Sequence, residues 1–164
     1  MSQTVDNLQE AFAGESQANR RYLAFAEKAD EEGYAQIARL FRAAAAAETV
    51  HAHNHLKVLK GVKSTAENLQ EAIEGETGEF REMYPRMIAQ AQAEGNKEAE
   101  RTFNYANEVE KIHAALFQKA LENRDDKKMA DIYVCSICGC TVEGEAPENC
   151  PVCKALKKFF KKID

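Results

Sequence analysis

The sequence lacks the features that would place the protein in a membrane, on nucleic acid or outside the cell. No run approaches the ~18 consecutive apolar residues of a membrane-spanning helix. Residues 1–10 are polar and acidic and have no apolar signal core. The formal net charge is −5 and no face is strongly basic, which argues against nucleic-acid binding. We therefore expect a cytoplasmic protein with neither a nucleic acid nor a membrane as partner.

Cysteine is also missing from most of the chain, yet five cysteines fall between Cys135 and Cys153. Thiols in a reducing cytoplasm seldom form structural disulfides, so paired C-x-x-C motifs indicate a metal site. Cys135 and Cys138 form one pair, and Cys150 and Cys153 form the other. Four thiolates suit a tetrahedral Zn²⁺ or a single Fe, and the spacing does not decide between these metals. Cys140 lies too close to Cys138 to join the site easily, so we expect a free thiol.

Hydrophobic periodicity divides the chain into a helical part and a small C-terminal module. The predicted helices cover about 4–32, 34–60, 65–95 and 97–123. Ser64 and Glu67 have the spacing of a capping box at the start of the third helix. Pro85 should distort the interior of that helix. We place the two domains at 1–126 and 127–164.

Each predicted helix carries glutamate on the stripe that should face the core. In the second helix this stripe contains Ile37, Phe41, Ala44, Glu48, His51, His55 and Val58. A buried carboxylate is costly unless positive charge meets it. The inward ionisable residues of the four helices are Glu15, Glu48, His51, Glu76, Glu79, Glu110 and His113. Two E-x-x-H motifs, with glutamate from each of the other two helices, indicate a dinuclear iron or manganese site in a four-helix bundle.

Taken together, these motifs resemble those of the rubrerythrin family over nearly the whole chain. The resemblance rests on E-S-Q-A-N-x-R-Y at 15–22, E-x-x-E-x-x-x-x-Y-P at 76–85, both E-x-x-H motifs and the rubredoxin-type cysteine pairs. It implies a mainly α protein, with a ferritin-like four-helix bundle followed by a small rubredoxin-like metal-bound β/loop domain. Cys140 replaces the aromatic residue usual in rubredoxin knuckles and Leu156 replaces a common proline, but neither change removes a ligand.

The resemblance also implies roles for individual residues. The implied ligands of a non-haem di-iron site are Glu15, Glu48, Glu76, Glu79, Glu110 and His113. A further iron would be bound by Cys135, Cys138, Cys150 and Cys153. His51 is implied as a ligand that exchanges with Glu79 on reduction. Tyr22 and Tyr84 occupy the family's hydrogen-bonding positions beside the di-iron site.

The implied activity is that of a peroxidase that reduces hydrogen peroxide to water and protects against oxidative stress. Electrons would come from NAD(P)H through a reductase or rubredoxin and pass through the cysteine-bound iron. Two other functions are compatible with part of the sequence. A ferroxidase or iron-storage bundle leaves the cysteine module without a purpose. A non-enzymatic bundle with a structural zinc ribbon leaves the inward polar residues unexplained.

The length of the chain limits how four helices could close one bundle. If the second and third helices run parallel, as in ferritin-like bundles, their connection must span ~33 Å to bring Glu48 and Glu76 to one level. Residues 61–65 reach only ~20 Å. The two helices therefore form an antiparallel hairpin, or helix pairs are exchanged between subunits. We favour the exchanged homodimer. Each of its sites would take Glu15, Glu48 and His51 from one chain and Glu76, Glu79, Glu110 and His113 from the other.

Overall fold

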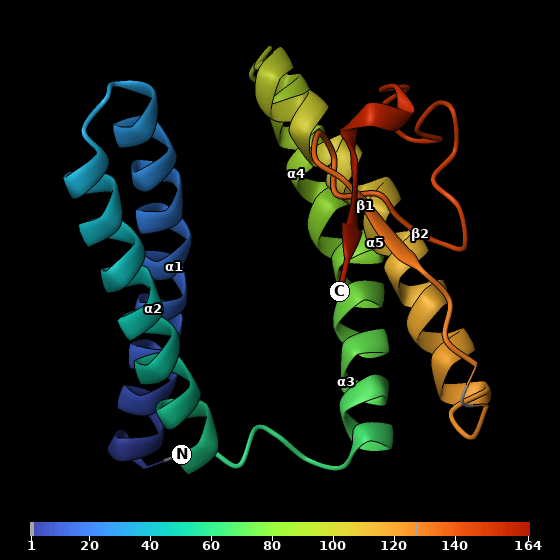
Figure 1. The fold of residues 1–164 in the computed structure, drawn as a ribbon. Helices are drawn as coiled ribbons and strands as arrows, with labels where there is room; N and C mark the ends of the chain where they lie inside the picture. The colour runs from blue at the N-terminus through green and yellow to red at the C-terminus, as the bar shows by residue number, and fades with distance from the viewer. Residues whose placement is uncertain (1, 127) are drawn as a thin grey trace. The chain divides into compact units, whose positions relative to one another are not determined.

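The computed structural model describes residues 2–126 and 128–164. The chain forms two compact units, the first ending at Lys63 and the second covering Ser64–Asp164 (Figure 1). The predicted fold class is confirmed: the protein is mainly α, with a small β module at its C-terminal end. Within the described residues, none of the helices combines the length and apolar character needed to cross a membrane.

The first unit is a helical hairpin made of α1 (Gln3–Glu31) and α2 (Ala35–Val58). The predicted stop is confirmed at Gly33, whose φ of +83° lets the chain reverse between the helices. Alanine dominates the residues buried between them: Ala18, Ala26, Ala29, Ala38, Ala45 and Ala52. Small side chains let two helices approach closely, so alanines form the fully buried part of the contact, and the rings of Phe25 and Phe41 add an edge-to-face contact between the helices.

The face of α2 that packs on α1 is not the predicted stripe. Ile37 and Val58, which were expected to face the core, are 47% and 64% exposed. The face of α2 that packs on α1 is instead formed by Ala38, Ala45 and Ala52. Phe41, Ala44, Glu48 and His55 of the predicted stripe are half-buried. The helix therefore has one alanine face packed on α1 and a second, partly exposed apolar stripe that carries Glu48.

The helices of the second unit are α3 (Thr65–Gly78), α4 (Tyr84–Ala93) and α5 (Lys97–Glu122). The predicted capping box is confirmed at the start of α3, where Ser64 and Glu67 exchange backbone and side-chain hydrogen bonds. The predicted distortion takes the form of a π-helical segment, η1 (Glu79–Met83), between α3 and α4. Pro85 has no N–H to donate to the carbonyl of Arg81, so regular α-helical bonding is interrupted within η1.

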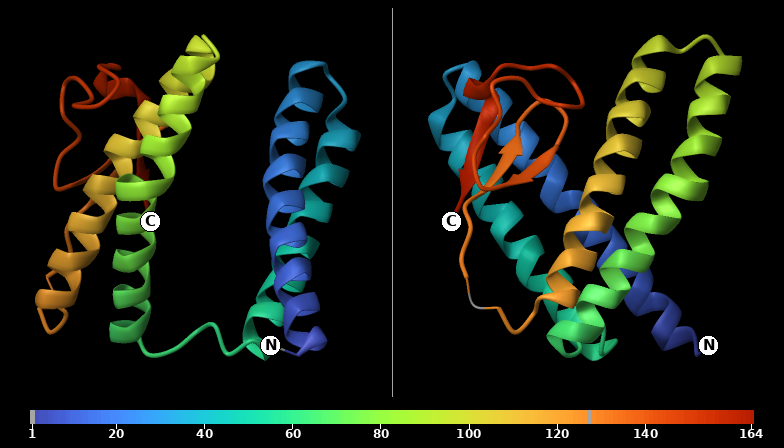
Figure 2. Two further views of the ribbon diagram at one scale, coloured as in Figure 1. Left: turned by 180° about the vertical axis from the view of Figure 1, so that it is seen from behind. Right: turned by 90° about the vertical axis from the view of Figure 1, so that its right-hand side faces the viewer.

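The C-terminal module contains a three-stranded antiparallel sheet in the order β2–β1–β3 (Figure 2). Its strands are β1 (Ile132–Cys135), β2 (Thr141–Glu143) and β3 (Phe160–Ile163), and a short 3₁₀ helix, η2 (Lys157–Phe159), precedes β3. The module packs against α5, where Val109 joins Cys135, Cys140, Cys150 and Phe160 in one buried cluster. The cysteine module and α5 therefore share a hydrophobic core.

Candidate metal centres

The first candidate metal centre joins the two helices of the hairpin. Ligand atoms of Glu15 on α1 and of Glu48 and His51 on α2 lie within 4.8 Å of one another. The spacing of three residues places His51 Nδ1 2.9 Å from Glu48 Oε2. The pKa of Glu15 is raised by a hydrogen bond to Glu48, by burial and by the charge of Glu48. The pKa of Glu48 is lowered by its hydrogen bonds to Glu15 and His51. Two carboxylates and an imidazole thus lie close enough together for a cation to be bound between them.

The second candidate centre lies in the other compact unit, where α3 packs on α5. Ligand atoms of Glu76, Glu110 and His113 lie within 4.8 Å of one another. His113 Nδ1 is 2.8 Å from Glu110 Oε2 and 3.7 Å from Glu76 Oε1. The pKa of Glu76 is raised by burial, by a hydrogen bond to Glu110 and by the charge of Glu110. Partly buried carboxylates around one imidazole nitrogen are the donor set that hard metal ions such as iron prefer.

Three other residues expected at the di-iron site lie outside these groups. The pKa of Glu79, in η1, is raised by burial and by the charge of Glu76. The pKa of Tyr84 is raised by burial and by the charges of Glu110, Glu79 and Glu76, which places its phenol near the second group. The Tyr22 ring lies 6.2 Å from the ring of Phe41 in the hairpin.

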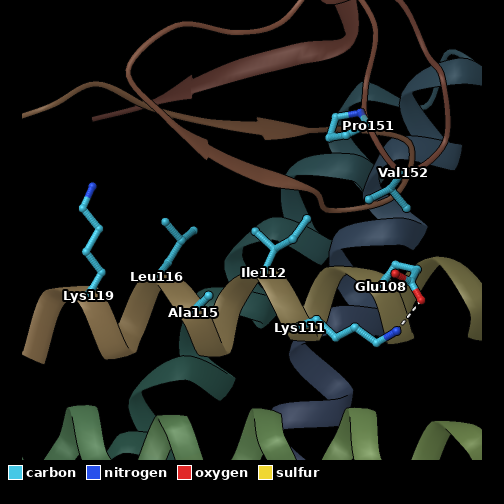
Figure 3. A pocket seen from close by; sticks show the side chains of 8 residues that line it. All are labelled: Glu108, Lys111, Ile112, Ala115, Leu116, Lys119, Pro151 and Val152. Carbon is cyan, nitrogen blue, oxygen red and sulfur yellow. Dashed lines mark hydrogen bonds and ion pairs between the residues drawn. The ribbon is translucent and has the colours of Figure 1, made fainter.

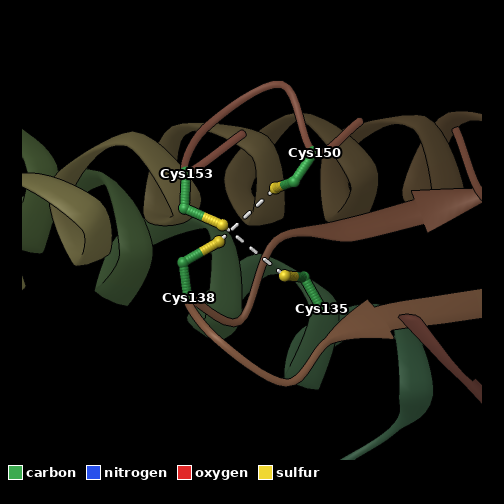
Figure 4. A group of neighbouring side chains, drawn as sticks. All are labelled: Cys135, Cys138, Cys150 and Cys153. Atoms are coloured by element: carbon green, nitrogen blue, oxygen red, sulfur yellow. Dashed lines mark hydrogen bonds between the residues drawn. The ribbon is translucent and has the colours of Figure 1, made fainter. Parts of the chain in front are cut away.

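The third candidate centre consists of four thiols from two loops that converge on one point (Figure 4). Cys135 Sγ is 3.7 Å from Cys153 Sγ, and Cys138 Sγ is 3.6 Å from Cys150 Sγ. A tetrahedral ion with metal–sulfur bonds of ~2.3 Å requires sulfur–sulfur distances of ~3.8 Å, whereas a disulfide requires ~2.05 Å. The observed distances therefore fit a four-thiolate metal site and exclude disulfides.

The two cysteine loops have matching backbone conformations. The N–H of Cys135 donates to the carbonyl of Cys140 at 2.9 Å, and the N–H of Cys150 donates to the carbonyl of Ala155 at 2.7 Å. The residue after each pair has a positive φ, +82° at Gly139 and +64° at Lys154. Two such loops present their thiols symmetrically to one ion.

Thiol acidity differs between Cys150 and Cys140. Burial disfavours the Cys150 thiolate, but backbone N–H groups of Cys153 and Val152 and the neighbouring thiols outweigh it and lower its pKa to about 7. Burial and the neighbouring thiols raise the pKa of Cys140 to about 12. Cys140 is fully buried in the core shared with α5. It therefore packs in this core and is not one of the four convergent thiols.

The sequence did not reveal two polar contacts that support the first two centres. Buried Asn19 donates from Nδ2 to the Ala45 carbonyl at 2.7 Å and to Thr49 Oγ1 at 2.9 Å, which joins α1 to α2 beside Glu48. His113 Nε2 lies 2.9 Å from Thr141 Oγ1 on β2. The position of Asn19 on the inward stripe of α1 was the available signal for the first contact; no local pattern signals the second.

An open groove of about 590 Å³ lies between α5 and the second cysteine loop (Figure 3). Ile112, Leu116 and Val152 line it, and Lys111 and Glu108 lie at one end, where they form an ion pair. No residue of the three candidate metal centres lines this groove. It is a surface feature separate from them.

The carboxylate–histidine groups on helices and the four-cysteine module define a class of protein, the ferritin-like di-iron proteins with a rubredoxin-like domain. The predicted cofactor sites are confirmed in their donor sets, with the residues of a di-iron carboxylate site and of a rubredoxin-like site. The rubrerythrin family model matches residues 6–121, and the model of the rubrerythrin rubredoxin-like domain matches residues 133–161. The chain belongs to the rubrerythrin family, whose members are oxidoreductases.

Individual relatives agree with this assignment over nearly the full length of the chain. The chain is 42% identical to rubrerythrin-2 of Clostridium acetobutylicum, covering 96% of this chain and 95% of the relative. It is 37% identical to nigerythrin of Nitratidesulfovibrio vulgaris, covering 96% and 85%. Solved structures of nigerythrin in mixed-valence and fully reduced, all-ferrous states each match with a TM-score of 0.60 and 36% identity, covering 99% of this chain and 88% of theirs.

Proposed function

We propose that the protein reduces hydrogen peroxide to water with electrons that pass through its own cysteine-bound iron. One observation carries the proposal. The group of Glu76, Glu110 and His113 and the four-cysteine group belong to one compact unit, and His113 contacts the cysteine module through Thr141. Reduction of one peroxide to two waters consumes two electrons and two protons. A storage bundle would have no use for an electron-carrying module beside its metal site.

The donor groups fit iron, which would supply the one-electron redox chemistry at both kinds of site when bound. The chain's own residues would hold protons. Burial and neighbouring carboxylates raise the pKa values of Glu79 and Tyr84, which makes both groups weaker acids than they are in water. We assign Glu79 and Tyr84 as proton-holding residues, Tyr22 as their counterpart in the hairpin, and His51 as the ligand that exchanges with Glu79 on reduction.

We further propose that two chains complete each di-iron site by exchanging their hairpins. From Glu48 to the end of α2 is ~15 Å, and from the start of α3 to Glu76 is ~17 Å. Parallel helices would need a connection of ~32 Å, whereas residues 59–64 reach ~25 Å at most. The single chain also exposes large apolar side chains of the hairpin: Leu23, Phe25, Ile37, Leu40, Val50 and Val58. A second copy would cover such a surface.

The electron donor is proposed to be a rubredoxin or an NAD(P)H-dependent reductase. The test of the function is metal analysis of protein expressed with iron, followed by full reduction and titration with peroxide. We expect about three irons per chain, thiolate-to-iron absorption in the visible spectrum and rapid oxidation by peroxide. Zinc at the cysteines, with slow oxidation by oxygen alone, would favour a ferroxidase or a structural module and would refute the peroxidase.

A further inference from the structure

Thr141 links the histidine of the second carboxylate group to the first cysteine loop. Its Oγ1 lies 2.9 Å from His113 Nε2 and 3.1 Å from the carbonyl oxygen of Gly139. A carbonyl can only accept, so the single hydroxyl hydrogen of Thr141 is donated to Gly139. The threonine oxygen then accepts from His113, which requires the hydrogen of the neutral imidazole to be on Nε2.

This hydrogen-bond direction decides which nitrogen of His113 can bind a metal. With the hydrogen on Nε2, Nδ1 carries the lone pair. In the metal-free protein its hydrogen bond with Glu110 Oε2 then needs a proton on one of the two groups, and a metal ion would take the place of that proton. Nδ1 is the nitrogen that faces Glu110 Oε2 at 2.8 Å and Glu76 Oε1 at 3.7 Å. The hydroxyl of Thr141 thus selects the tautomer whose lone pair points at the carboxylates.

We propose that Thr141 is a positioning residue that holds His113 in the orientation and tautomer required for metal binding. The inference requires a metal at the second group but no peroxide chemistry. It therefore stands or falls separately from the proposed peroxidase activity. Partners of this kind raise the basicity of a metal-binding histidine, and their removal typically lowers metal affinity or activity about 10- to 100-fold.

The surroundings of Thr141 allow its hydroxyl to be removed without detaching the module. Thr141 pairs with Val134 in the β1–β2 ladder, and valine has the same branched shape and suits a strand. The module also keeps its packing on Val109 and the ion pair between Lys119 and Glu143. Thr141→Val therefore removes the hydrogen bonds of one hydroxyl and leaves the other contacts in place.

The experiment measures metal affinity in the full-length chain. One equivalent of Zn²⁺ is first added to fill the thiolate site, and Co²⁺ is then titrated into the carboxylate–histidine site and followed by its visible bands. We expect Thr141→Val to weaken Co²⁺ binding about 10-fold or more. Thr141→Ser, which keeps the hydroxyl, should bind as the wild type does.

Ser136→Ala is the matched control. Ser136 lies in the first cysteine loop, and its hydroxyl donates to the Phe159 carbonyl at 3.0 Å, within the same module. Its removal should leave Co²⁺ affinity unchanged. If Ser136→Ala weakens Co²⁺ binding as much as Thr141→Val does, the effect reflects stability of the module, and the positioning role is refuted.

A spectroscopic measurement tests the hydrogen bond itself. In Zn²⁺-loaded protein with ¹⁵N-labelled histidine, the Nε2–H of His113 should exchange slowly with water in the wild type and in Thr141→Ser. The signal is assigned by its loss in His113→Gln. Thr141→Val should speed this exchange. Unchanged exchange together with unchanged Co²⁺ affinity in Thr141→Val would overturn the inference.

Discussion

The two carboxylate–histidine groups share a local geometry and differ in what surrounds it. In both E-x-x-H motifs the histidine Nδ1 lies close to the glutamate Oε2, at 2.9 Å for Glu48 and His51 and at 2.8 Å for Glu110 and His113. The His51 side chain is 53% exposed, whereas the His113 side chain is 25% exposed and contacts Thr141. Helical spacing therefore sets the contact within each motif, and tertiary packing sets its environment.

The same contrast explains the different acidities of the two groups. In the hairpin, the main cause of the shifts is the hydrogen bond between Glu15 and Glu48, which raises one pKa and lowers the other. In the second unit, burial is the first cause of the raised pKa values of Glu76 and Glu79. In the proposed dinuclear site, the hairpin of one chain and the second unit of the other would each supply part of the ligands. The predictions below test whether the two carboxylate–histidine groups bind metal together and how their environments differ.

The largest expected effect is complementation between two inactive variants. One variant carries Glu48→Ala with His51→Ala, and the other carries Glu110→Ala with His113→Ala. Each variant alone should lose di-iron binding completely, because every site would lack the glutamate and histidine of one E-x-x-H motif. Co-expressed in equal amounts, the two should recover about a quarter of the wild-type sites, since half of the dimers are mixed and each has one intact site. Iron content and peroxide turnover measure the recovery.

Two controls sharpen this result. Light scattering should report a dimer for the wild type and for both variants, because neither pair of substitutions removes the exposed apolar side chains of the hairpin that a second copy would cover. Mixing the variants after separate purification, without unfolding, should recover sites only as fast as subunits exchange. No recovery from co-expressed dimers would show that both halves of each site come from one chain.

Much of the fold could be predicted because several helix ends have a local chemical signal. Gly33 stops α1, Ser64 and Glu67 begin α3, and Pro85 produces the π-helical segment, all within short stretches of sequence. The cysteine site could be predicted for the same reason, because the backbone hydrogen bonds of each C-x-x-C loop form within a few residues. Residues that act within a few positions of one another can be interpreted without the tertiary structure.

The contacts that could not be predicted join distant positions. His113 and Thr141 are separated by 28 positions, and neither periodicity nor spacing relates a helix to the strand that packs on it. The side of α2 that packs on α1 also escaped prediction, because the sequence pattern does not distinguish Ala38, Ala45 and Ala52 from the other alanines of that helix. Side-chain chemistry indicated the metals, whereas tertiary packing determines the supporting hydrogen bonds.

An intermediate effect is expected from the buried asparagines of the two units. Asn19 bonds the Ala45 carbonyl and the Thr49 hydroxyl, so Asn19→Ala should lower the free energy of unfolding by about 1–2 kcal/mol. Asn107 on α5 is also buried, but its Oδ1 has no hydrogen-bond partner within the described structure. Asn107→Leu should therefore be neutral or stabilising by up to about 1 kcal/mol. Thermal denaturation measures the change in stability of each variant. If both variants lose the same stability, the two asparagines do not differ in the way that their hydrogen bonds predict.

The smallest expected effect is a difference in pH dependence, because the carboxylates are only partly buried and solvent weakens their interactions. The raised pKa values of Glu76 and Glu79 mean that the folded, metal-free protein binds protons more tightly than the unfolded chain. Its stability should therefore fall as pH rises above the ordinary carboxyl pKa of 4.5. In the hairpin, the raised pKa of Glu15 and the lowered pKa of Glu48 act in opposite directions.

Paired variants make this difference measurable. Glu76→Gln with Glu79→Gln removes the groups that ionise unfavourably, so the gain in melting temperature over the wild type should be larger at pH 7 than at pH 4.5. Glu15→Gln with Glu48→Gln should show a smaller change in gain between the two pH values. Added Fe²⁺ or Co²⁺ should stabilise the wild type at pH 7, because the metal binds the ionised carboxylates. With metal present, the wild type should therefore melt at a higher temperature than the glutamine variants. A larger pH effect from the hairpin pair would show that the hydrogen bond between Glu15 and Glu48, rather than burial, controls the stability of the metal-free protein.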